Sequence, residues 1–300
     1  MWRSHVAQVA ASVDGLVPVV KGNGYGFGRT RLASVAAEFA DTIAVGSVHE
    51  LDGLPEGIDT VVLTPIPTAQ ALTAPEENSL ILTVGSDEHI RALDGWGGCV
   101  LVKVASTMQR FGRGVELVTA ARRAGLQVEG VSVHPPLAGT MAEHAAGIVD
   151  AARDVPPDLP VWVSHVDPAT YRSLPTTHTY RLRLGTMLWH GDKSALHLDA
   201  DVIDVRPVAP GQPVGYRLTP APADGHLVIV GAGTANGVTP LDDGRSPFHH
   251  QRKRLVLVEP PHMHVSMTFV PKGDAVPAVG DWIDLQRPLH MTHVDDTRWL

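Results

Sequence analysis

The sequence predicts an α/β protein: a (β/α)8 barrel of the TIM type over residues 1–195, followed by a smaller C-terminal all-β domain over residues 196–300. Eight short apolar runs lie before residue 185, and segments with helix signals separate most of them. Near-continuous apolar strands that alternate with helices indicate a parallel sheet. Eight such units in about 185 residues favour a closed barrel, with an open doubly wound sheet as the alternative. After residue 195 helix signals are nearly absent, which favours a separate β domain.

The predicted barrel strands are short and bounded by polar residues or glycines. They are Leu16–Val20, Thr42–Gly46, Thr60–Leu63, Leu80–Val84, Cys99–Val104, Val128–Val133, Val161–Val166 and Thr179–Arg183. Between them, residues 29–39 place Leu32, Val35 and Phe39 on one helical face. Other helices are marked by residues typical of helix ends. These are the capping box from Ser47 to Glu50, Ser86 before residues 87–93, Gly125 after residues 115–124, and the capping box from Thr140 to Glu143 before residues 141–153.

The pattern of residues 196–300 predicts short strands separated by turns rich in Pro, Gly and Asp. The predicted strands are Ala200–Val208, Pro213–Thr219, His226–Val230, Arg254–Val258, His264–Val270 and Trp282–Leu285. Residues 241–253 are predicted to form a polar loop.

Composition excludes several classes of protein. Hydrophobic residues make up 44% and charged residues 19%, which suits a folded core. No apolar run is long enough to span a membrane, and the N-terminal residues do not read as a signal peptide, so we expect a cytoplasmic protein. A net charge of −8 without a long basic cluster argues against nucleic acid as a partner. The single cysteine, Cys99, excludes an internal disulfide framework and a multi-cysteine zinc site.

Lys21 directly follows the first predicted strand and precedes Gly-Asn-Gly-Tyr-Gly-Phe-Gly at residues 22–28. A lysine that leaves an apolar strand is partly desolvated, which lowers the pKa of its amine and makes it nucleophilic. Such an amine can form an imine with an aldehyde cofactor. The glycines let backbone amides approach a phosphate closely. Taken alone, Lys21 also fits a surface lysine beside a flexible turn.

Other chemically useful side chains follow later predicted strands. In a parallel barrel the carboxyl ends of the strands meet at one face, where active sites lie. The candidates at this face are Lys103 and Arg110, His134, Ser164 with His165 and Asp167, and Arg183 with Gly185 and Thr186. Each is weak evidence alone, and their shared placement is what favours a functional site.

Three segments together resemble one family. Residues 19–28 read Val-Val-Lys-Gly-Asn-Gly-Tyr-Gly-Phe-Gly, residues 103–112 read Lys-Val-Ala-Ser-Thr-Met-Gln-Arg-Phe-Gly, and residues 183–191 read Arg-Leu-Gly-Thr-Met-Leu-Trp-His-Gly. They resemble, in order, the Val-Val-Lys-Ala-Asn-Ala-Tyr-Gly-His-Gly, Lys-Val-Asp-Thr-Gly-Met-x-Arg-Leu-Gly and Arg-x-Gly-Ile-x-Leu-Tyr-Gly segments of the alanine racemase family, fold-type III enzymes that use pyridoxal 5'-phosphate (PLP). Residues 210–216 and 279–281 are similar to that family's β domain, so the resemblance covers nearly the whole chain.

This resemblance implies PLP as the cofactor and a homodimer whose active sites are completed across the interface. Lys21 would carry the internal aldimine and act as a catalytic base. Tyr25, Gly185 and Thr186 would hold the phosphate. The implied substrate is a small amino acid.

Further roles follow from the same resemblance. Arg110 would face the phenolic oxygen of the cofactor and the substrate, His134 would pack near the ring, and Met267 would lie near the substrate. Lys103 is the position that is carbamylated in some members. Arg183 would face the pyridine nitrogen, where a guanidinium opposes protonation and makes the ring a weaker electron sink.

The sequence also departs from the family pattern. The family's Gly-Tyr-x-Asp-Gly supplies the second catalytic base, a tyrosine, whereas residues 233–237 read Gly-Thr-Ala-Asn-Gly with Thr234 at the tyrosine position. A threonine hydroxyl is far less acidic than a phenol and is poorly suited to proton exchange at carbon. Ala105 stands for the family's Asp, and Pro168 for a serine in a loose alignment.

Histidines offer one replacement for the missing base. His262 and His264 precede Met267 in a segment that approaches the site in the family. Together with His290 and His293 they also have spacings that permit a metal site, although exposed loop histidines remain the simpler interpretation. We therefore expect a racemase-like enzyme with altered chemistry. The alternatives are a one-base PLP lyase, aldolase or decarboxylase, and a non-catalytic descendant that binds PLP or a partner protein.

Overall fold

The computed structural model describes residues 1–67 and 80–298. The chain divides into two compact units. The barrel unit comprises residues 1–25 and 29–195, and the β unit comprises residues 26–28 and 196–300.

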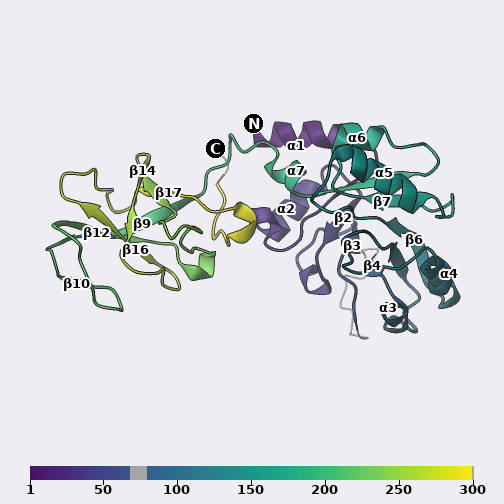
Figure 1. The fold of residues 1–300 in the computed structure, drawn as a ribbon, viewed down its shortest axis with the longest axis horizontal. Coiled ribbons are helices and arrows are strands. Elements are labelled where there is room, and N and C mark those ends of the chain that lie inside the picture. The colour runs from purple at the N-terminus through teal and green to yellow at the C-terminus, as the bar shows by residue number, and fades with distance from the viewer. Residues whose placement is uncertain (68–79, 299–300) are drawn as a thin grey trace. The chain divides into compact units, whose positions relative to one another are not determined.

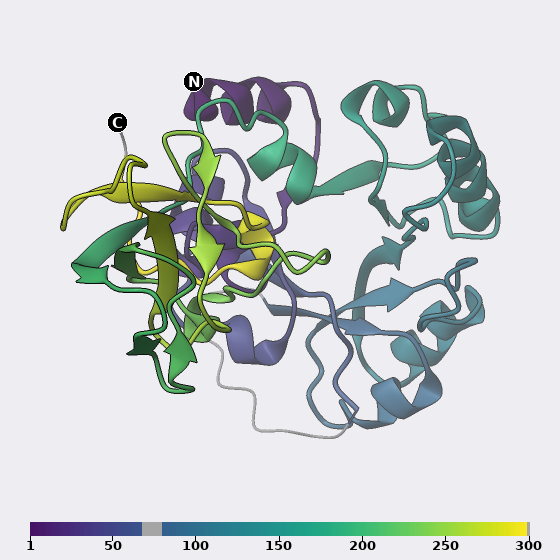
Figure 2. The same ribbon diagram turned by 60° about the vertical axis from the view of Figure 1, so that its left-hand side comes forward.

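The barrel unit contains an eight-stranded parallel sheet in the order β1-β8-β7-β6-β5-β4-β3-β2. Its strands are β1 (Leu16–Pro18), β2 (Thr42–Val45), β3 (Asp59–Val62), β4 (Leu80–Val84), β5 (Cys99–Lys103), β6 (Gln127–Ser132), β7 (Val161–Val163) and β8 (Tyr180–Leu184). A parallel bridge between Val19 and Ala44 joins the two end strands, and the Val20 amide donates to the Ala44 carbonyl at 2.8 Å. The sheet therefore closes into a barrel, as predicted, and the open doubly wound alternative is wrong (Figures 1 and 2).

The interior of this barrel is filled by apolar side chains, most of them branched. One buried cluster takes a residue from most of the strands: Val17, Val19, Ala44, Val61, Ile81, Leu101 and Trp162. Branched side chains that fill the centre in this way leave a packed core rather than a pore. Chemistry is therefore confined to the strand ends and loops.

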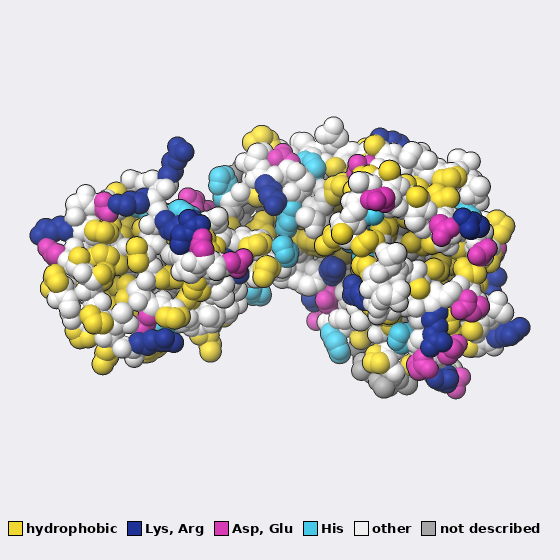
Figure 3. Space-filling view, viewed as in Figure 1, with side chains coloured by type: hydrophobic (Ala, Val, Ile, Leu, Met, Phe, Trp, Pro, Cys, Tyr) yellow, Lys and Arg dark blue, Asp and Glu magenta, His cyan; other side chains and the backbone are white. Residues whose placement is uncertain are grey.

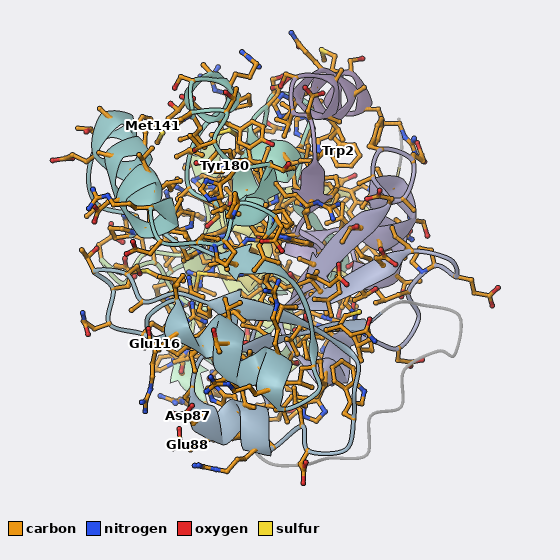
Figure 4. All side chains as sticks on the ribbon, turned by 90° about the vertical axis from the view of Figure 1, so that its right-hand side faces the viewer. Trp2, Asp87, Glu88, Glu116, Met141 and Tyr180 are labelled. Carbon is orange, nitrogen blue, oxygen red and sulfur yellow. The ribbon has the colours of Figure 1, made fainter. Side chains whose placement is uncertain are left out.

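Helices cover the outside of the barrel (Figure 1). They are α1 (Trp2–Ala11), α2 (Arg29–Ala36), α3 (Asp87–Arg91), α4 (Glu116–Arg123), α5 (Met141–Ala152), α6 (Pro168–Arg172) and α7 (Thr186–His190). Figure 4 labels Trp2, Glu116 and Met141 on α1, α4 and α5. The caps predicted at Ser86 and Thr140 are confirmed, because the two hydroxyls accept from the amides of His89 and Glu143 at 3.3 Å and 3.2 Å.

One predicted capping box is wrong. Residues Val48–Glu50 form a single 3-10 turn (η2), and the Ser47 side chain makes no cap hydrogen bond. The Glu50 carboxylate instead accepts from the Gly46 amide at 2.7 Å, so the residue that was expected to cap a helix faces back toward the end of β2.

Among the described residues, three helices were not predicted. Helix α1 buries only Trp2 and Val6, so its apolar face is narrow. Helices α6 and α7 have five residues each, too few for periodicity to be read. At α6 the Asp167 carboxylate accepts from the Thr170 amide at 2.7 Å and Pro168 opens the helix. Asp167 therefore acts as a helix cap.

The β unit contains a seven-stranded antiparallel sheet in the order β14-β13-β17-β9-β12-β16-β15, and a two-stranded hairpin β10-β11. The strands are β9 (Asp199–Val208), β10 (Pro213–Val214), β11 (Thr219–Pro220), β12 (Gly225–Val230), β13 (Phe248–His250), β14 (Lys253–Arg254), β15 (Val256–Leu257), β16 (Ser266–Pro271) and β17 (Trp282–Leu285). Two 3-10 turns complete it, η3 (Thr234–Asn236) and η4 (Leu289–Met291). The predicted all-β character is confirmed.

Three details of the β unit differ from the prediction. Residues 213–219 do not form one continuous strand but two short strands joined by a turn. The turn arises because Gly215 and Leu218 have left-handed φ angles of 72° and 51°. Residues 253–257 are likewise two short strands. The predicted polar loop contains β13, whose Phe248 is fully buried in the core. One aromatic side chain thus anchors a strand inside a polar stretch.

The surface carries both signs of charge, interspersed on the face that Figure 3 shows. Within residues 1–67 and 80–298, no helix combines the length and apolar character that crossing a membrane requires.

Candidate active site

The carboxyl ends of β1, β5, β6 and β8 bring together four basic groups of the barrel unit. They are Lys21 after β1, Lys103 at the end of β5, His134 after β6, and Arg183 in β8. The charges of Arg183, Lys103 and Lys21 all lower the pKa of His134, after burial, which is the largest effect. The four groups therefore share one electrostatic environment at the predicted end of the barrel.

Lys21 has the amine that the sequence analysis singled out. The residue is exposed, yet the pKa of the amine is lowered, first by the burial of its charged group and next by the charge of Arg110. Glu50 opposes this shift and Arg183 adds to it. A lowered pKa increases the fraction of neutral, nucleophilic amine near neutral pH.

Glu50 is a site residue that sequence reasoning missed. A Cβ atom at Gly46 would lie 3.1 Å from both Glu50 carboxylate oxygens and 3.3 Å from the Lys21 Cβ. The glycine thus leaves room for the carboxylate and the lysine on either side of it. A carboxylate close after the end of a strand could have indicated a site residue. The spacing from Ser47 to Glu50 instead suggested a capping box, so Glu50 was interpreted as part of a helix cap.

Arg183 is 7% exposed, and burial lowers the pKa of its guanidinium to about 10. Its Nη2 donates to the Val133 carbonyl at 3.1 Å and lies 3.5 Å from the Ser164 hydroxyl. Its Nε is buried and has no hydrogen-bond acceptor among the described residues. A buried N–H donor without an acceptor is costly, so this atom suits an acceptor that a ligand would bring.

His134 and Lys103 are both held away from their charged forms. The Ser164 hydroxyl is hydrogen-bonded to Nδ1 of His134, whose pKa falls to about 2 through burial and the neighbouring positive charges. Lys103 is buried, and burial together with the charges of Arg183 and Arg110 lowers its pKa to about 7. Its Nζ lies 3.5 Å from the Ser132 carbonyl.

The Tyr25 side chain packs closely against the backbone of Gly185. Tyr25 has a left-handed backbone (φ 55°), and the His190 Nε2 donates to its carbonyl at 2.8 Å. A Cβ atom at Gly185 would lie 2.0 Å from the Tyr25 hydroxyl, so only glycine allows this approach. Burial raises the pKa of Tyr25 to about 12, which keeps the phenol as a hydrogen-bond donor. Thr186 is exposed and begins α7.

Arg110 is exposed on the loop after β5, with its guanidinium carbon 4.9 Å from the centroid of the Phe111 ring. Its charge acts on both Lys21 and Lys103, which places it with the same cluster.

Thr234 and Met267 belong to the β unit. Thr234 is exposed in η3, and its amide donates to the His262 carbonyl at 2.8 Å. Met267 is part of β16, where it pairs with Ile229 of β12. It packs against an apolar cluster that includes Phe269. Its role as a substrate contact stays a prediction.

The histidine spacings that would permit a metal site are not joined into a ligand cluster among the described residues. Within the described part of the chain no group of three or more His, Cys, Asp or Glu side chains is placed to hold a metal ion. His262 instead contacts the buried carboxylate of Glu259, which also accepts from the amides of Tyr216 and Arg217 at 3.0 Å and 3.1 Å.

The fold and this cluster define the class of the molecule: a parallel barrel with a lysine of lowered pKa and a buried arginine at its carboxyl end, and a β unit that follows in the chain. The chain matches the family model described as alanine racemase, N-terminal domain, over residues 2–192. It therefore belongs to the alanine racemase family.

Individual relatives agree with this assignment. An alanine racemase from Streptococcus gordonii is 27% identical over 254 residues, which cover 74% of this chain and 68% of that protein. Alanine racemase from Bartonella henselae, solved with covalently bound PLP, has a TM-score of 0.70 at 18% identity, covering 96% of this chain and 88% of the other. Alanine racemase from Bacillus anthracis, solved with bound L-Ala-P, has a TM-score of 0.70 at 22% identity, covering 95% and 82%. At these identities the structural matches establish the fold.

Proposed function

We propose that this protein is a PLP-dependent enzyme that moves a proton at the α-carbon of a small amino acid, as a racemase does. One observation carries the proposal: two complementary groups occur at the same end of the barrel. They are the Lys21 amine, whose pKa is lowered, and the buried Nε of Arg183, which has no acceptor among the described residues. Family membership and the covalently bound PLP of the Bartonella henselae structure support it.

The residues at the barrel end fit PLP. A neutral amine at Lys21 suits its aldehyde, and the Arg183 N–H suits its pyridine nitrogen as an acceptor. The Tyr25 phenol, kept protonated, with Gly185 and Thr186, is the proposed phosphate-binding set. Arg110 is the proposed partner of the phenolic oxygen and of the substrate, and His134 would pack near the ring.

When bound, PLP supplies an electron sink for the pair that is released at the α-carbon. Lys21 accepts the α-proton on one face and returns it, because its lowered pKa makes both directions accessible near neutral pH. Arg183 remains charged up to about pH 10 and opposes protonation of the pyridine nitrogen beside it. Lys103 is buried, and the charges of Arg183 and Arg110 act on it. We propose that it contributes further positive charge around the cofactor site.

Racemisation also needs a proton-exchanging group on the opposite face. Thr234 takes the position of the family's tyrosine, and its hydroxyl is a poor acid and base. This substitution favours a second candidate, a one-base PLP lyase, aldolase or decarboxylase, in which Lys21 alone exchanges protons. We propose further that the protein is a homodimer and acts in the cytoplasm.

PLP uptake tests the proposal. Purified protein should gain a visible absorption band with PLP, and borohydride should fix the cofactor covalently to Lys21, as located by peptide mass spectrometry. Lys21→Ala should bind PLP without covalent attachment, whereas Lys193→Ala, an exposed lysine, should behave as the wild type. Protein that never takes up PLP would overturn the proposal.

Isotope exchange then separates the two candidate reactions. L- and D-alanine are incubated with the holoenzyme in deuterium oxide. Label that enters with inversion favours racemisation, and label that enters one enantiomer without inversion favours the one-base reaction. A holoenzyme that exchanges neither, nor any other small amino acid, would instead indicate a non-catalytic PLP-binding descendant.

A further inference from the structure

The phenols of the barrel unit are poorly placed to supply the second proton-exchanging group. The sequence contains four tyrosines. Tyr25 has a raised pKa and a hydroxyl packed against Gly185. Tyr171 donates to the carbonyls of Asp14 and Tyr180, and Tyr180 itself begins β8, at the opposite end of the strands from Lys21. Tyr216 lies in the β unit and is 86% exposed. Among the described residues of the barrel unit that contains Lys21, no phenol is therefore suited to this role, so a second base within this unit must be a different acid–base group.

His165 lies after β7, at the same end of the barrel as Lys21, and its tautomer is fixed by a backbone contact. Its Nδ1 lies 2.8 Å from the Pro135 carbonyl, which only accepts, so Nδ1 carries the proton. In the neutral ring the lone pair is therefore on Nε2, the atom that faces away from the Pro135 carbonyl. The ring is half-buried, which leaves part of it accessible.

The backbone at His165 is strained, and strained backbone is often found at functional sites. Its φ is 59°, a left-handed angle that non-glycine residues seldom adopt. The neighbouring contacts hold this angle, because Nδ1 of the buried His144 lies 3.0 Å from the His165 carbonyl. The Pro135 and His144 contacts together hold the ring and the backbone in one orientation.

His134 does not offer the same chemistry, although its ring centroid is 4.3 Å from that of His165. Its Nδ1 is occupied by the Ser164 hydroxyl, which lies 3.5 Å from the Arg183 guanidinium. Its pKa of about 2 keeps it unprotonated at any physiological pH. A base that exchanges protons must be able to hold one, and His134 is prevented from doing so.

The surroundings of His165 suit a group that accepts and returns a proton. Burial lowers its pKa, which leaves the ring neutral and basic, while the Pro135 and Pro136 carbonyls raise the pKa by stabilising the protonated form. The charged or titratable groups that act on it are Arg183 and His144, both of which lower the pKa, together with His134, whose ring it contacts.

We infer that His165 is the second catalytic base, and that its Nε2 exchanges the α-proton on the face opposite Lys21. This inference rests on the proposed function and names the group that replaces the missing tyrosine. In one direction the Cα–H bond breaks, the proton moves to Nε2 of His165, and the electron pair stays at the carbon. Lys21 then delivers a proton to the other face, which inverts the centre, and the reverse reaction exchanges the two roles.

The tautomer can be tested without turnover. Protein labelled with ¹⁵N-histidine is studied by two-bond ¹H–¹⁵N correlation, with and without PLP, and the His165 resonance is assigned by its loss in His165→Asn. We expect a neutral ring with the proton on Nδ1 at pH 7, and an Nε2 lone pair that becomes protonated on acidification. A proton on Nε2 of the neutral ring would overturn the inference.

The catalytic role is tested by exchange in His165→Asn. Asparagine tolerates left-handed backbone angles, and its side-chain amide can donate to the Pro135 carbonyl, so the variant removes the base while keeping the local structure. We expect unchanged PLP uptake. Deuterium exchange of one alanine enantiomer should fall by about 100-fold or more, and exchange of the other, which Lys21 serves, should be largely kept. His178→Asn is the matched control, because its Nε2 also donates to a backbone carbonyl, that of Val155, away from the site.

The outcomes separate this inference from the proposed function. If the wild type takes up no PLP, the proposed function fails and the inference fails with it. If PLP binds and His165→Asn still exchanges both enantiomers at wild-type rates, only the inference fails. Loss of exchange in His262→Gln but not in His165→Asn would assign the role to the histidine beside Glu259 instead, and would also overturn it.

Discussion

At the scale of single residues, the contact between Gly185 and Tyr25 is the tightest constraint on the proposed phosphate-binding set. A methyl group at position 185 would lie 2.0 Å from the Tyr25 hydroxyl, so Gly185→Ala must displace the phenol. We expect the affinity for PLP to fall about tenfold or more, and stability to fall by about 1–3 kcal/mol. PLP titration and thermal unfolding measure both effects.

Gly147 provides the control for this change. It lies inside α5, where an added Cβ would meet no atom within 4 Å. Gly147→Ala should leave PLP affinity unchanged and raise stability by about 0.5–1 kcal/mol, since alanine favours a helix. Equal loss of PLP affinity in both variants would contradict the contact argument.

Lys103 gives a pH-dependent prediction. Its pKa is lowered to about 7 in the folded protein, so between about pH 7 and pH 10.5 the unfolded chain binds more protons than the folded one. Stability therefore rises with pH across this window, and the full penalty is present below it. Lys103→Met should raise the stability of the protein without PLP by about 2–4 kcal/mol near pH 6, since each pKa unit corresponds to about 1.4 kcal/mol.

Thermal unfolding at a series of pH values measures this effect. The variant should lose much of the rise in stability between pH 7 and pH 10. Lys193→Met, at an exposed position, should keep the wild-type pH dependence. An unchanged pH dependence in Lys103→Met would show that Lys103 binds its proton as readily in the folded chain as in the unfolded one.

At the scale of elements, α5 depends on its capping box. The Thr140 hydroxyl accepts from the Glu143 amide, and the Glu143 carboxylate accepts from the Thr140 amide at 2.6 Å. Thr140→Ala should lower the unfolding free energy by about 1 kcal/mol, because it leaves an amide of the first turn without a protein acceptor. Chemical denaturation measures this, with Thr239→Ala, an exposed threonine outside any helix or strand, as the control. Equal effects in the two variants would count against the cap.

The same elements explain how far the sequence alone could predict the fold. Most of the barrel strands were predicted because both of their faces are covered, so each of these strands is a nearly unbroken apolar run. Strands β6 and β8 include charged residues, and their apolar residues alone marked them. Helix α5 was predicted because its cap is local. Strand β13 was missed because its burial depends on one residue, Phe248, among polar neighbours. Pairing partners such as β17 come from distant sequence and leave no local signal.

The candidate site was predictable to a different extent. Lys21 was identified because its glycine-rich segment is itself the motif. Glu50 and the orientation of His165 were not, since both depend on contacts between separate loops. Glu50 acts on Lys21 across Gly46, and His165 is oriented by the carbonyl of Pro135, which follows a different strand. Such contacts exist only once the barrel has closed.

At the scale of the whole molecule, the proposed groups divide between the two units. Lys21 and His165 both belong to the barrel unit, whereas Thr234 belongs to the β unit. In a homodimer whose sites are shared, the β unit of one subunit would complete the site of the other. Two bases within one barrel make proton exchange a property of each subunit. A base supplied by the β unit would make it a property of the pair.

Hybrid dimers distinguish these arrangements. Lys21→Ala subunits are mixed in equal amounts with His165→Asn subunits, after light scattering has established the dimer. Because both bases come from one barrel, every site in the hybrid lacks one of them, and activity should stay at the level of the parents. If the partner subunit supplied the second base, random pairing would restore about a quarter of wild-type activity, because half of the dimers would have one complete site. Mixing Lys21→Ala with His262→Gln applies the same test to the β unit, and recovery there, without recovery in the first mixture, would place the second base across the interface.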